Sequence, residues 1–293
     1  MPLRVEKKDL SGLTVLITGA NVGIGLETTR MLSEMGAQVT IACRNAKKAE
    51  AAAEDIEKTT GNRPDTALLD LSILESTADF VKGYMAKHQR LDILINNAGV
   101  VSTEKAQDGL TQDGFEIDFQ VNHLSHFFMT VRLLPLIKYA SQHKVNDFIP
   151  RVVVLGSNAA KVGKIDYDYL QNGDKLPFFF DRYANSKLMN AMFTKKLAEK
   201  VKDDGIVAHF VHPGLVASVR LLVKATARSN VQGAMTSVHV AISDEATKSS
   251  GKYWDSCKIA EYPNKLMTDE ISLNDLWSKS VQYMKEKGFE VEE

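Results

Sequence analysis

The sequence has 293 residues, of which 44% are hydrophobic and 25% are charged, and its formal net charge is −1. The hydrophobic content excludes a disordered chain, and the balanced charge argues against a nucleic-acid partner. The two cysteines, Cys43 and Cys257, are far apart and have no CxxC pair or ligand cluster beside them, so neither a disulfide framework nor a metal site is predicted.

The first nine residues are charged and contain no apolar core of a secretory leader. The sequence also has no run of about 20 apolar residues that would anchor it in a membrane. We therefore expect a cytoplasmic protein without an integral membrane anchor.

Short apolar runs alternate with longer helical patterns along the chain. Strands are expected at 13–17, 37–42, 67–69, 91–95, 152–155 and 206–211, and helices at 24–36, 46–59, 73–88, 119–144 and 183–202, with the helix at 119–144 interrupted and bent by Pro135. This alternation predicts a Rossmann-type, doubly wound α/β fold with a parallel sheet and helices on both faces. We expect a single domain over residues 1–293, with a cofactor half at about 10–150 and a catalytic and substrate half at about 151–293.

A glycine-rich turn joins the first strand to the first helix. Glycines let a backbone turn tightly and approach a pyrophosphate, and the helix N-terminus offers free N–H groups and a positive dipole end. A plain glycine turn is the alternative, and the strand–turn–helix context favours dinucleotide binding. The cofactor-binding residues expected in this turn are Gly19, Asn21, Val22, Gly23, Ile24 and Gly25.

Three residues separate Gly19 from Gly23, and one separates Gly23 from Gly25. This TGxxxGxG spacing, together with the motifs below, resembles the short-chain dehydrogenase/reductase superfamily. Within it, the segments at 20–25, 42–45, 113–116, 121–124 and 251–254 look like the branch of retinol dehydrogenases, WW-domain oxidoreductase and protochlorophyllide reductase. The segment at 269–277 looks like the C-terminal helix of that branch. The sequence lacks the N-terminal anchor of membrane-bound retinol dehydrogenases and the WW domains, so the branch does not fix a retinoid as substrate.

The end of the second strand favours NADP(H) over NAD(H). Cys43 stands where the resemblance places the acid that holds a ribose 2′-hydroxyl, and Arg44 follows it. A guanidinium can pair with a 2′-phosphate, whereas a carboxylate would repel it. A solvated arginine is the alternative. Because Asn21 and Val22 are neutral, the preference depends on one charge, which Lys47 or Lys48 could assist.

Further cofactor contacts follow from the resemblance. Asp70 and Leu71 resemble the pair that contacts adenine, although Asp70 could equally cap the next helix. The NNAG motif that lines the cofactor site corresponds to Asn96–Gly99, and the motif that caps the nicotinamide pocket begins at His212. The residues assigned to cofactor binding in these two motifs are Asn97, Ala98, Gly99, Pro213, Gly214 and Val216.

Tyr183 and Lys187 are four residues apart, so on a helix they point into the same cleft. Free tyrosine has a pKa of about 10. The lysine and a positive nicotinamide should lower it, so that Tyr183 can exchange a proton with a carbonyl or alcohol oxygen. The resemblance gives Lys187 the ribose hydroxyls as well, Ser157 the substrate oxygen, and Asn122 a water that links Lys187 to solvent. These four residues form the predicted catalytic tetrad.

The expected reaction is hydride transfer between NADP(H) and a carbonyl or alcohol of a bulky hydrophobic substrate. Aromatic residues between Ser157 and Tyr183 could line the substrate site or merely pack their loop on the domain. Residues 215–231 are expected to form an apolar lid. Two alternatives are a catalytically silent NADP(H)-binding regulator and a C=C reductase. The aromatic residues in question are Tyr167, Tyr169, Phe178, Phe179 and Phe180.

The two long helices, at 119–144 and 183–202, often build a homodimer in the superfamily. Their apolar residues, such as Phe127, Phe128 and Met192, could instead pack in the core. His123 and His126 have no metal-ligand spacing and are expected to be helix-surface or packing residues.

Overall fold

The computed structural model describes residues 3–102, 109–215 and 228–291. In this part of the chain an eight-stranded sheet has the order β3-β2-β1-β4-β5-β6-β7-β8. Strands β1 to β7 pair in parallel, and β8 runs antiparallel to β7. The strands are β1 (Thr14–Thr18), β2 (Gln38–Cys43), β3 (Asp65–Leu68), β4 (Ile93–Asn96), β5 (Arg151–Leu155), β6 (Val207–His212), β7 (Lys252–Asp255) and β8 (Lys258–Ala260).

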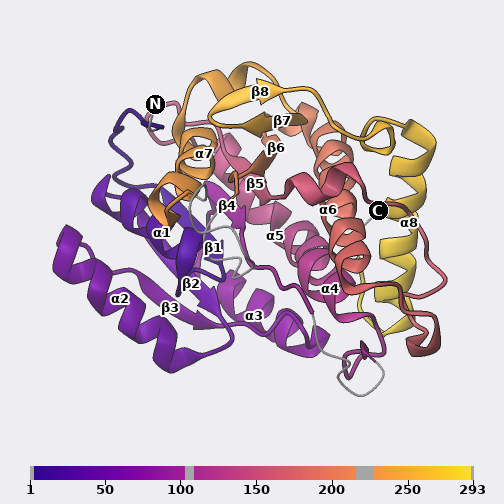
Figure 1. Ribbon diagram of the computed structural model, residues 1–293. Helices are drawn as coiled ribbons and strands as arrows, with labels where there is room; N and C mark the ends of the chain where they lie inside the picture. The colour runs from indigo at the N-terminus through magenta and orange to yellow at the C-terminus, as the bar shows by residue number, and fades with distance from the viewer. Residues whose placement is uncertain (1–2, 103–108, 216–227, 292–293) are drawn as a thin grey trace.

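Helices cover both faces of this sheet (Figure 1). The helices are α1 (Gly23–Glu34), α2 (Ala46–Thr60), α3 (Leu74–Lys87), α4 (Ile117–Phe119), α5 (Ser125–Gln142), α6 (Phe179–Lys200), α7 (Asn230–Ile242) and α8 (Glu270–Glu286). The strand order reverses between β1 and β4, and in open α/β sheets ligands bind at the carboxyl ends of the strands at such a reversal. The prediction of a doubly wound α/β fold is confirmed.

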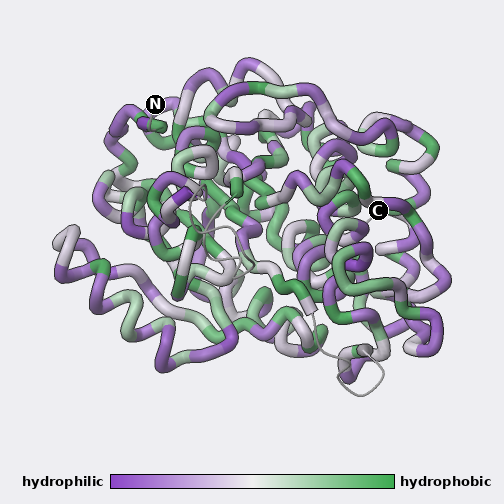
Figure 2. The backbone as a smooth tube through the Cα atoms, viewed as in Figure 1, coloured by the Kyte–Doolittle hydropathy of each residue, from purple (hydrophilic) through white to green (hydrophobic). Residues whose placement is uncertain are grey.

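Each central strand buries both of its faces. In β5, Val152 and Val154 pack with α3, α5, α6 and α8, whereas Val153 and Leu155 pack with α1, α2 and α7. This alternation follows from the two-residue period of a strand, and it explains why the strands are continuous apolar runs in the sequence. Figure 2 shows hydrophobic residues concentrated in the interior and hydrophilic residues on the outer helix faces. Among the described helices, none is long and apolar enough to cross a membrane.

The helix predicted at 119–144 is interrupted at a different place. The structure has the short α4, then a π-helix over Gln120–Leu124, and then α5, which continues through Pro135 to Gln142. The prediction of an interruption at Pro135 is therefore wrong. The departure from α-helical geometry falls on the turn that contains Asn122, and π-helical turns of this kind are frequent at functional sites.

The end of the chain contains elements that the sequence patterns did not predict. These are α7 and the antiparallel hairpin of β7 and β8. The hairpin turn consists of Ser256 and Cys257, both with positive φ (55° and 61°), in place of the glycine or asparagine that usually marks such a turn. The predicted C-terminal helix is present as α8.

Candidate active site

The glycine-rich turn has the shape of an anion site. Gly19 and Gly23 have positive φ angles of 63° and 64°. A Cβ atom at Gly19 would lie 2.8 Å from the Cα of Ala98, so no side chain fits there. The N-cap residue of α1, Val22, makes no side-chain capping bond, and the first turn of α1 contains no acid. The N-terminal N–H groups of α1 are therefore oriented to receive an anion.

The ends of β2 and β3 lie beside this turn in the sheet order. Cys43 is buried, while Arg44 is exposed and forms no ion pair within the described residues, so its guanidinium is available to a ligand. Lys47 and Lys48, at the start of α2, are also exposed.

Asp70 does not cap α3, because the N-cap residue of that helix is Ile73. The Oδ1 atom of Asp70 instead accepts bonds from the N–H and the hydroxyl of Ser72. The side chain of Leu71 is buried in the core. An adenine contact from Leu71 would therefore have to come from its backbone.

The NNAG turn after β4 connects the glycine-rich turn to the predicted tetrad. Asn97 donates from Nδ2 to the carbonyl oxygen of Thr18 at 2.7 Å, and its own Oδ1 is buried without a partner in the described structure. A Cβ atom at Gly99 would lie 3.0 Å from the Nζ of Lys187 and 3.2 Å from the Oδ1 of Asn122. Gly99 thus lets these two tetrad side chains approach the backbone of the turn.

The structure brings the four predicted tetrad residues to one place. Lys187 is buried, and its Nζ donates to the carbonyl of Leu155 at 3.3 Å and lies 5.7 Å from the ring centre of Tyr183. The side chain of Ser157, just beyond β5, lies close enough to Tyr183 to lower the pKa of the Tyr183 hydroxyl. Asn122 is fixed by Val100, whose N–H donates to Oδ1 at 2.7 Å and whose carbonyl accepts from Nδ2 at 3.0 Å.

Burial dominates the electrostatics of the tetrad. It lowers the pKa of Lys187 to about 8, and the carboxylate of Asp118 opposes this shift. Burial raises the pKa of Tyr183, and the nearby Ser157 has a smaller opposing effect. The sequence predicts that Lys187 and a positive nicotinamide lower the pKa of Tyr183. In the protein by itself this lowering is absent, because Lys187 is not among the groups that shift the pKa of Tyr183. Asp118 itself is buried beside Glu116, and its pKa rises to about 7.

The turn after β6 contains two of the three predicted nicotinamide-pocket residues. Pro213 accepts a bond at 3.1 Å from Arg228, whose own N–H donates to the carbonyl of Leu215 at 2.7 Å. The guanidinium of Arg228 also stands where a side chain at Gly214 would lie. Val216 and most of the predicted lid lie outside the described residues, and residues 230 and 231 belong to α7 rather than to a lid.

The structure divides the aromatic segment before Tyr183 into two groups. Tyr169 is buried and bonds to Asn185, and Tyr167 packs against the core, so both stabilise their loop. Phe178 and Phe180 are 66% and 43% exposed. They lie at the beginning of α6, which starts at Phe179, four residues earlier than predicted.

Thr18 is a residue of this region that the sequence analysis did not single out. Of the two alternatives for His123 and His126, the structure shows packing residues, because both are buried and hydrogen-bonded. His126 contacts Thr18, the residue immediately before the glycine-rich turn. The position of Thr18 at the strand end was the available signal. Among the described residues, no group of three or more His, Cys, Asp or Glu could hold a metal ion.

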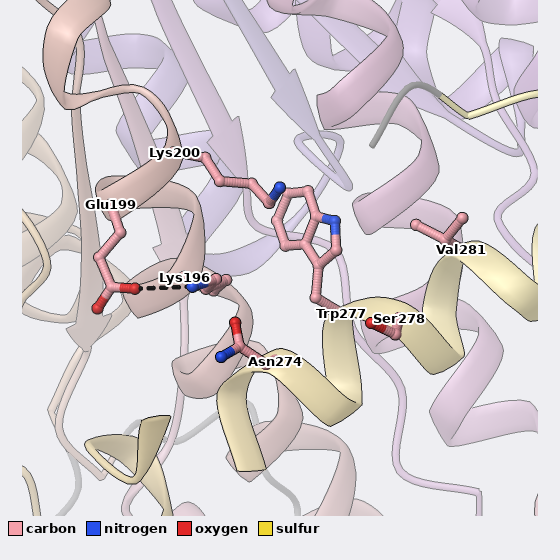
Figure 3. A pocket seen from close by; sticks show the side chains of 7 residues that line it. All are labelled: Lys196, Glu199, Lys200, Asn274, Trp277, Ser278 and Val281. Carbon is pink, nitrogen blue, oxygen red and sulfur yellow. Dashed lines mark hydrogen bonds and ion pairs between the residues drawn. The ribbon is translucent and has the colours of Figure 1, made fainter. Parts of the chain in front are cut away.

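A groove of about 360 Å³ lies between α6 and α8 (Figure 3). Lys196 and Lys200 line it from α6, with Asn274 and Trp277 opposite them on α8. Lys200 follows Lys187 by 13 residues, which is about 20 Å along a helix. No tetrad residue lines this groove, so it is separate from the predicted active site.

The packing of α8 against the two long helices bears on the predicted homodimer. Trp277 of α8 packs edge-on against Phe127 of α5, with ring centres 5.0 Å apart, and stacks on Phe193 of α6 at 6.0 Å. Phe127, Phe128 and Met192 are buried in the core. The helix α8 therefore occupies part of the surface of the two long helices, and a homodimer through them stays a prediction.

A family model described as short chain dehydrogenase matches residues 13–169 of this chain. The chain belongs to the short-chain dehydrogenase family. This short-chain dehydrogenase is 40% identical to retinol dehydrogenase 12 of Bos taurus over 261 residues, which cover 85% of this chain and 79% of the relative. It is 36% identical to the WW domain-containing oxidoreductase of Drosophila melanogaster, with 93% of this chain and 68% of the relative covered. A crystal structure of an uncharacterized protein from Mycobacterium Paratuberculosis aligns with a TM-score of 0.80 and 28% identity, covering 99% of this chain and 100% of that one.

Proposed function

We propose that this short-chain dehydrogenase is an NADP(H)-dependent alcohol dehydrogenase or carbonyl reductase that acts on a bulky hydrophobic substrate, with Tyr183 as general acid and base. The observation that carries this proposal is the meeting of Tyr183, Ser157 and Lys187 at the carboxyl edge of the sheet. The NNAG turn joins them to the glycine-rich turn. A proton-transfer group thus lies next to a dinucleotide cradle.

The residues present fit a bound dinucleotide. The uncapped N-terminus of α1 would receive its pyrophosphate, and the unpaired Arg44 would receive a 2′-phosphate. The unpartnered Oδ1 of Asn97 would accept a hydrogen bond from it. When bound, the nicotinamide supplies or accepts the hydride.

Side chains of the protein itself would hold and transfer the proton. Because the pKa of Tyr183 is raised, its hydroxyl stays protonated at neutral pH and can donate to a carbonyl oxygen during reduction. Ser157 would hold that oxygen near Tyr183. Lys187, with a pKa of about 8, is mostly charged at neutral pH and would stabilise the tyrosinate that remains. In cells with a reduced NADP pool, carbonyl reduction is the expected direction.

The substrate class follows from where apolar side chains are exposed. Val101, Val162 and Leu215, which follow β4, β5 and β6, are 38%, 58% and 54% exposed. Phe178 and Phe180 are exposed about one turn before Tyr183 on α6. Parallel strands end at one edge of the sheet, so the segments after β4, β5 and β6 surround the predicted hydride-transfer position. The names of the retinol dehydrogenase relatives agree with an apolar alcohol or aldehyde.

The test is fluorescence titration of the purified protein with NADPH and NADH, followed by turnover of bulky and small ketones and aldehydes. We expect tighter binding of NADPH and turnover of the bulky apolar carbonyls. Tyr183→Phe should bind NADPH normally and lose turnover by about 100-fold or more. Tyr169→Phe is the matched control, because it also removes one buried tyrosine hydroxyl but leaves the tetrad intact.

Each alternative gives a different result. NADPH binding without turnover of any carbonyl would favour the silent regulator. Reduction of a C=C bond, identified by product analysis, would favour chemistry of the protochlorophyllide reductase type. Turnover limited to small polar carbonyls would contradict the apolar substrate site.

A further inference from the structure

A buried chain of hydrogen bonds joins three segments that are far apart in the sequence. At its centre the Oγ1 of Thr18, the last residue of β1, lies 2.9 Å from the Nε2 of His126. The same oxygen accepts the backbone N–H groups of Asn97 and Ala98, each at 3.0 Å. The Nδ1 of His126 lies 3.1 Å from the carbonyl oxygen of Asn122 in the π-helical turn.

The partners of His126 determine its tautomer. A carbonyl oxygen only accepts, so the proton of the imidazole is on Nδ1 and is donated to Asn122. Nε2 is then an acceptor, and the hydroxyl of Thr18 donates to it. Thr18 thereby uses its one donor and both of its lone pairs. Burial keeps the ring neutral by lowering the pKa of His126 to about 4.

The chain of bonds continues from Asn122 to the catalytic helix. The Nδ2 of Asn122 donates to the hydroxyl of Ser186 at 2.9 Å, and that hydroxyl donates to the backbone carbonyl of Tyr183 at 2.8 Å. Each link is buried or partly buried, so water does not readily replace it. A displacement of the glycine-rich turn would therefore also shift the turn of α6 that contains Tyr183.

We propose that His126 is a positioning residue that fixes the glycine-rich turn and the NNAG turn against Asn122, so that cofactor binding and the catalytic tetrad share one geometry. This inference depends on the proposed function, because it assigns the two turns to the cofactor. His126 itself would touch neither cofactor nor substrate.

The chain provides a matched control three residues away. His123 lies in the π-helical turn just before α5, which contains His126. It is about equally buried, and burial lowers its pKa to about 3. Its Nε2 lies 3.0 Å from the hydroxyl of Ser280 on α8, so its bond leads away from the tetrad. His123→Leu and His126→Leu remove one buried imidazole each, but only the second one breaks the connection to Thr18.

The experiment measures the Kd for NADPH by fluorescence, the kcat and KM for a bulky ketone, and the midpoint of urea unfolding. We expect both leucine variants to lower the midpoint. Only His126→Leu should weaken NADPH binding, by about 10-fold, and also lower kcat, as follows from losing a buried hydrogen bond. Thr18→Val should weaken NADPH binding at least as much, because it also removes the acceptor of the Asn97 and Ala98 N–H groups. The double variant with His126→Leu should bind NADPH no more weakly than Thr18→Val alone, because Thr18→Val already breaks the bond to His126.

If His126→Leu does not fold, His126→Gln and His126→Met carry the test. A glutamine at position 126 can place an amide oxygen near the hydroxyl of Thr18, whereas a methionine of similar length cannot replace that bond, so His126→Gln should bind NADPH more tightly than His126→Met. Equal NADPH affinity in His126→Leu and His123→Leu, or additive effects of Thr18→Val and His126→Leu, would overturn the inference alone. A wild-type protein that bound neither nicotinamide would overturn the proposed function, and this inference with it.

Discussion

Arg44 carries the predicted preference for NADP(H) as a single charge. It is exposed and unpaired in the described structure, so it has no structural partner that its replacement would disrupt. Arg44→Asp should weaken NADPH binding by roughly 10- to 100-fold, from the loss of a charge-assisted hydrogen bond, and should favour NADH. Fluorescence titrations of both cofactors measure this change.

The control for that titration is Lys58→Asp, which makes nearly the same change in net charge at the far end of α2. An equal loss of NADPH affinity in both variants would mean that net charge, and not Arg44, sets the preference.

The charge of Lys187 should set the alkaline limit of activity. Its pKa is lowered to about 8, so its charge is present below that pH and is lost as the pH rises through it. The raised pKa of Tyr183 excludes tyrosine ionisation as the cause of a limit there. We therefore expect kcat/KM for carbonyl reduction to fall above about pH 8 and the fall to be absent in Lys187→Arg, which keeps its charge. An unchanged fall in that variant would assign the titration to another group.

The sequence predicted the identities of the site residues better than the environments of their side chains. The glycine spacing and the Tyr183–Lys187 pair were readable because each depends on local backbone geometry. The pKa of Tyr183 depends on burial among elements that are distant in the sequence. The bond between His126 and Thr18 joins residues that are 108 positions apart, so no local sequence pattern could indicate it.

Among the elements, α8 packs against α5 and α6 through aromatic contacts. Trp277 contacts Phe127 and Phe193, and the Nζ of Lys200 lies 4.8 Å from its ring centre. Trp277→Ala should lower the free energy of unfolding by about 3–5 kcal/mol, because it leaves a cavity between α5 and α6. It should leave the affinity for NADPH unchanged.

Urea unfolding of Trp277→Ala and Ile271→Ala measures this contribution. Ile271 is on the same helix but is 81% exposed, and its replacement should change the stability by less than about 0.5 kcal/mol. Similar losses of stability in the two variants would contradict the packing role of Trp277.

Helices and buried strands were predicted well where a long periodic pattern defined them. The π-helical turn at Gln120–Leu124 was not, because it has the same composition as an ordinary helix. Strand β8 has only three residues, and its turn at Ser256 lacks the usual glycine. The sequence pattern therefore identified strands β1 to β6 and missed the edge formed by β7 and β8.

For the whole molecule, buried neutral histidines predict acid sensitivity. Burial lowers the pKa of His123 to about 3 and the pKa values of His126 and His209 to about 4. In the unfolded chain these residues titrate near 6.5, so their contribution to stability is present above that pH and is lost as the pH falls towards 4. Asp118 opposes this trend, because its raised pKa favours the folded state at low pH.

The three histidines should affect the pH dependence of stability more than the single carboxylate of Asp118. The free energy of unfolding should therefore fall between about pH 6.5 and pH 4, as urea titrations at several pH values would show. His209→Gln should reduce the slope by about one proton. A free energy of unfolding that stayed constant over this interval would contradict the burial of these histidines.

We propose that this molecule transfers a hydride from NADPH to a carbonyl carbon. The most direct measurement is incubation with NADPH that has deuterium at both C4 positions of the nicotinamide and a bulky apolar α,β-unsaturated ketone, with mass spectrometry and NMR of the product. We predict one deuterium on the carbinol carbon, and none with Tyr183→Phe over the same time. Deuterium at a former C=C carbon, or no transfer from a cofactor that binds tightly, would contradict the claim.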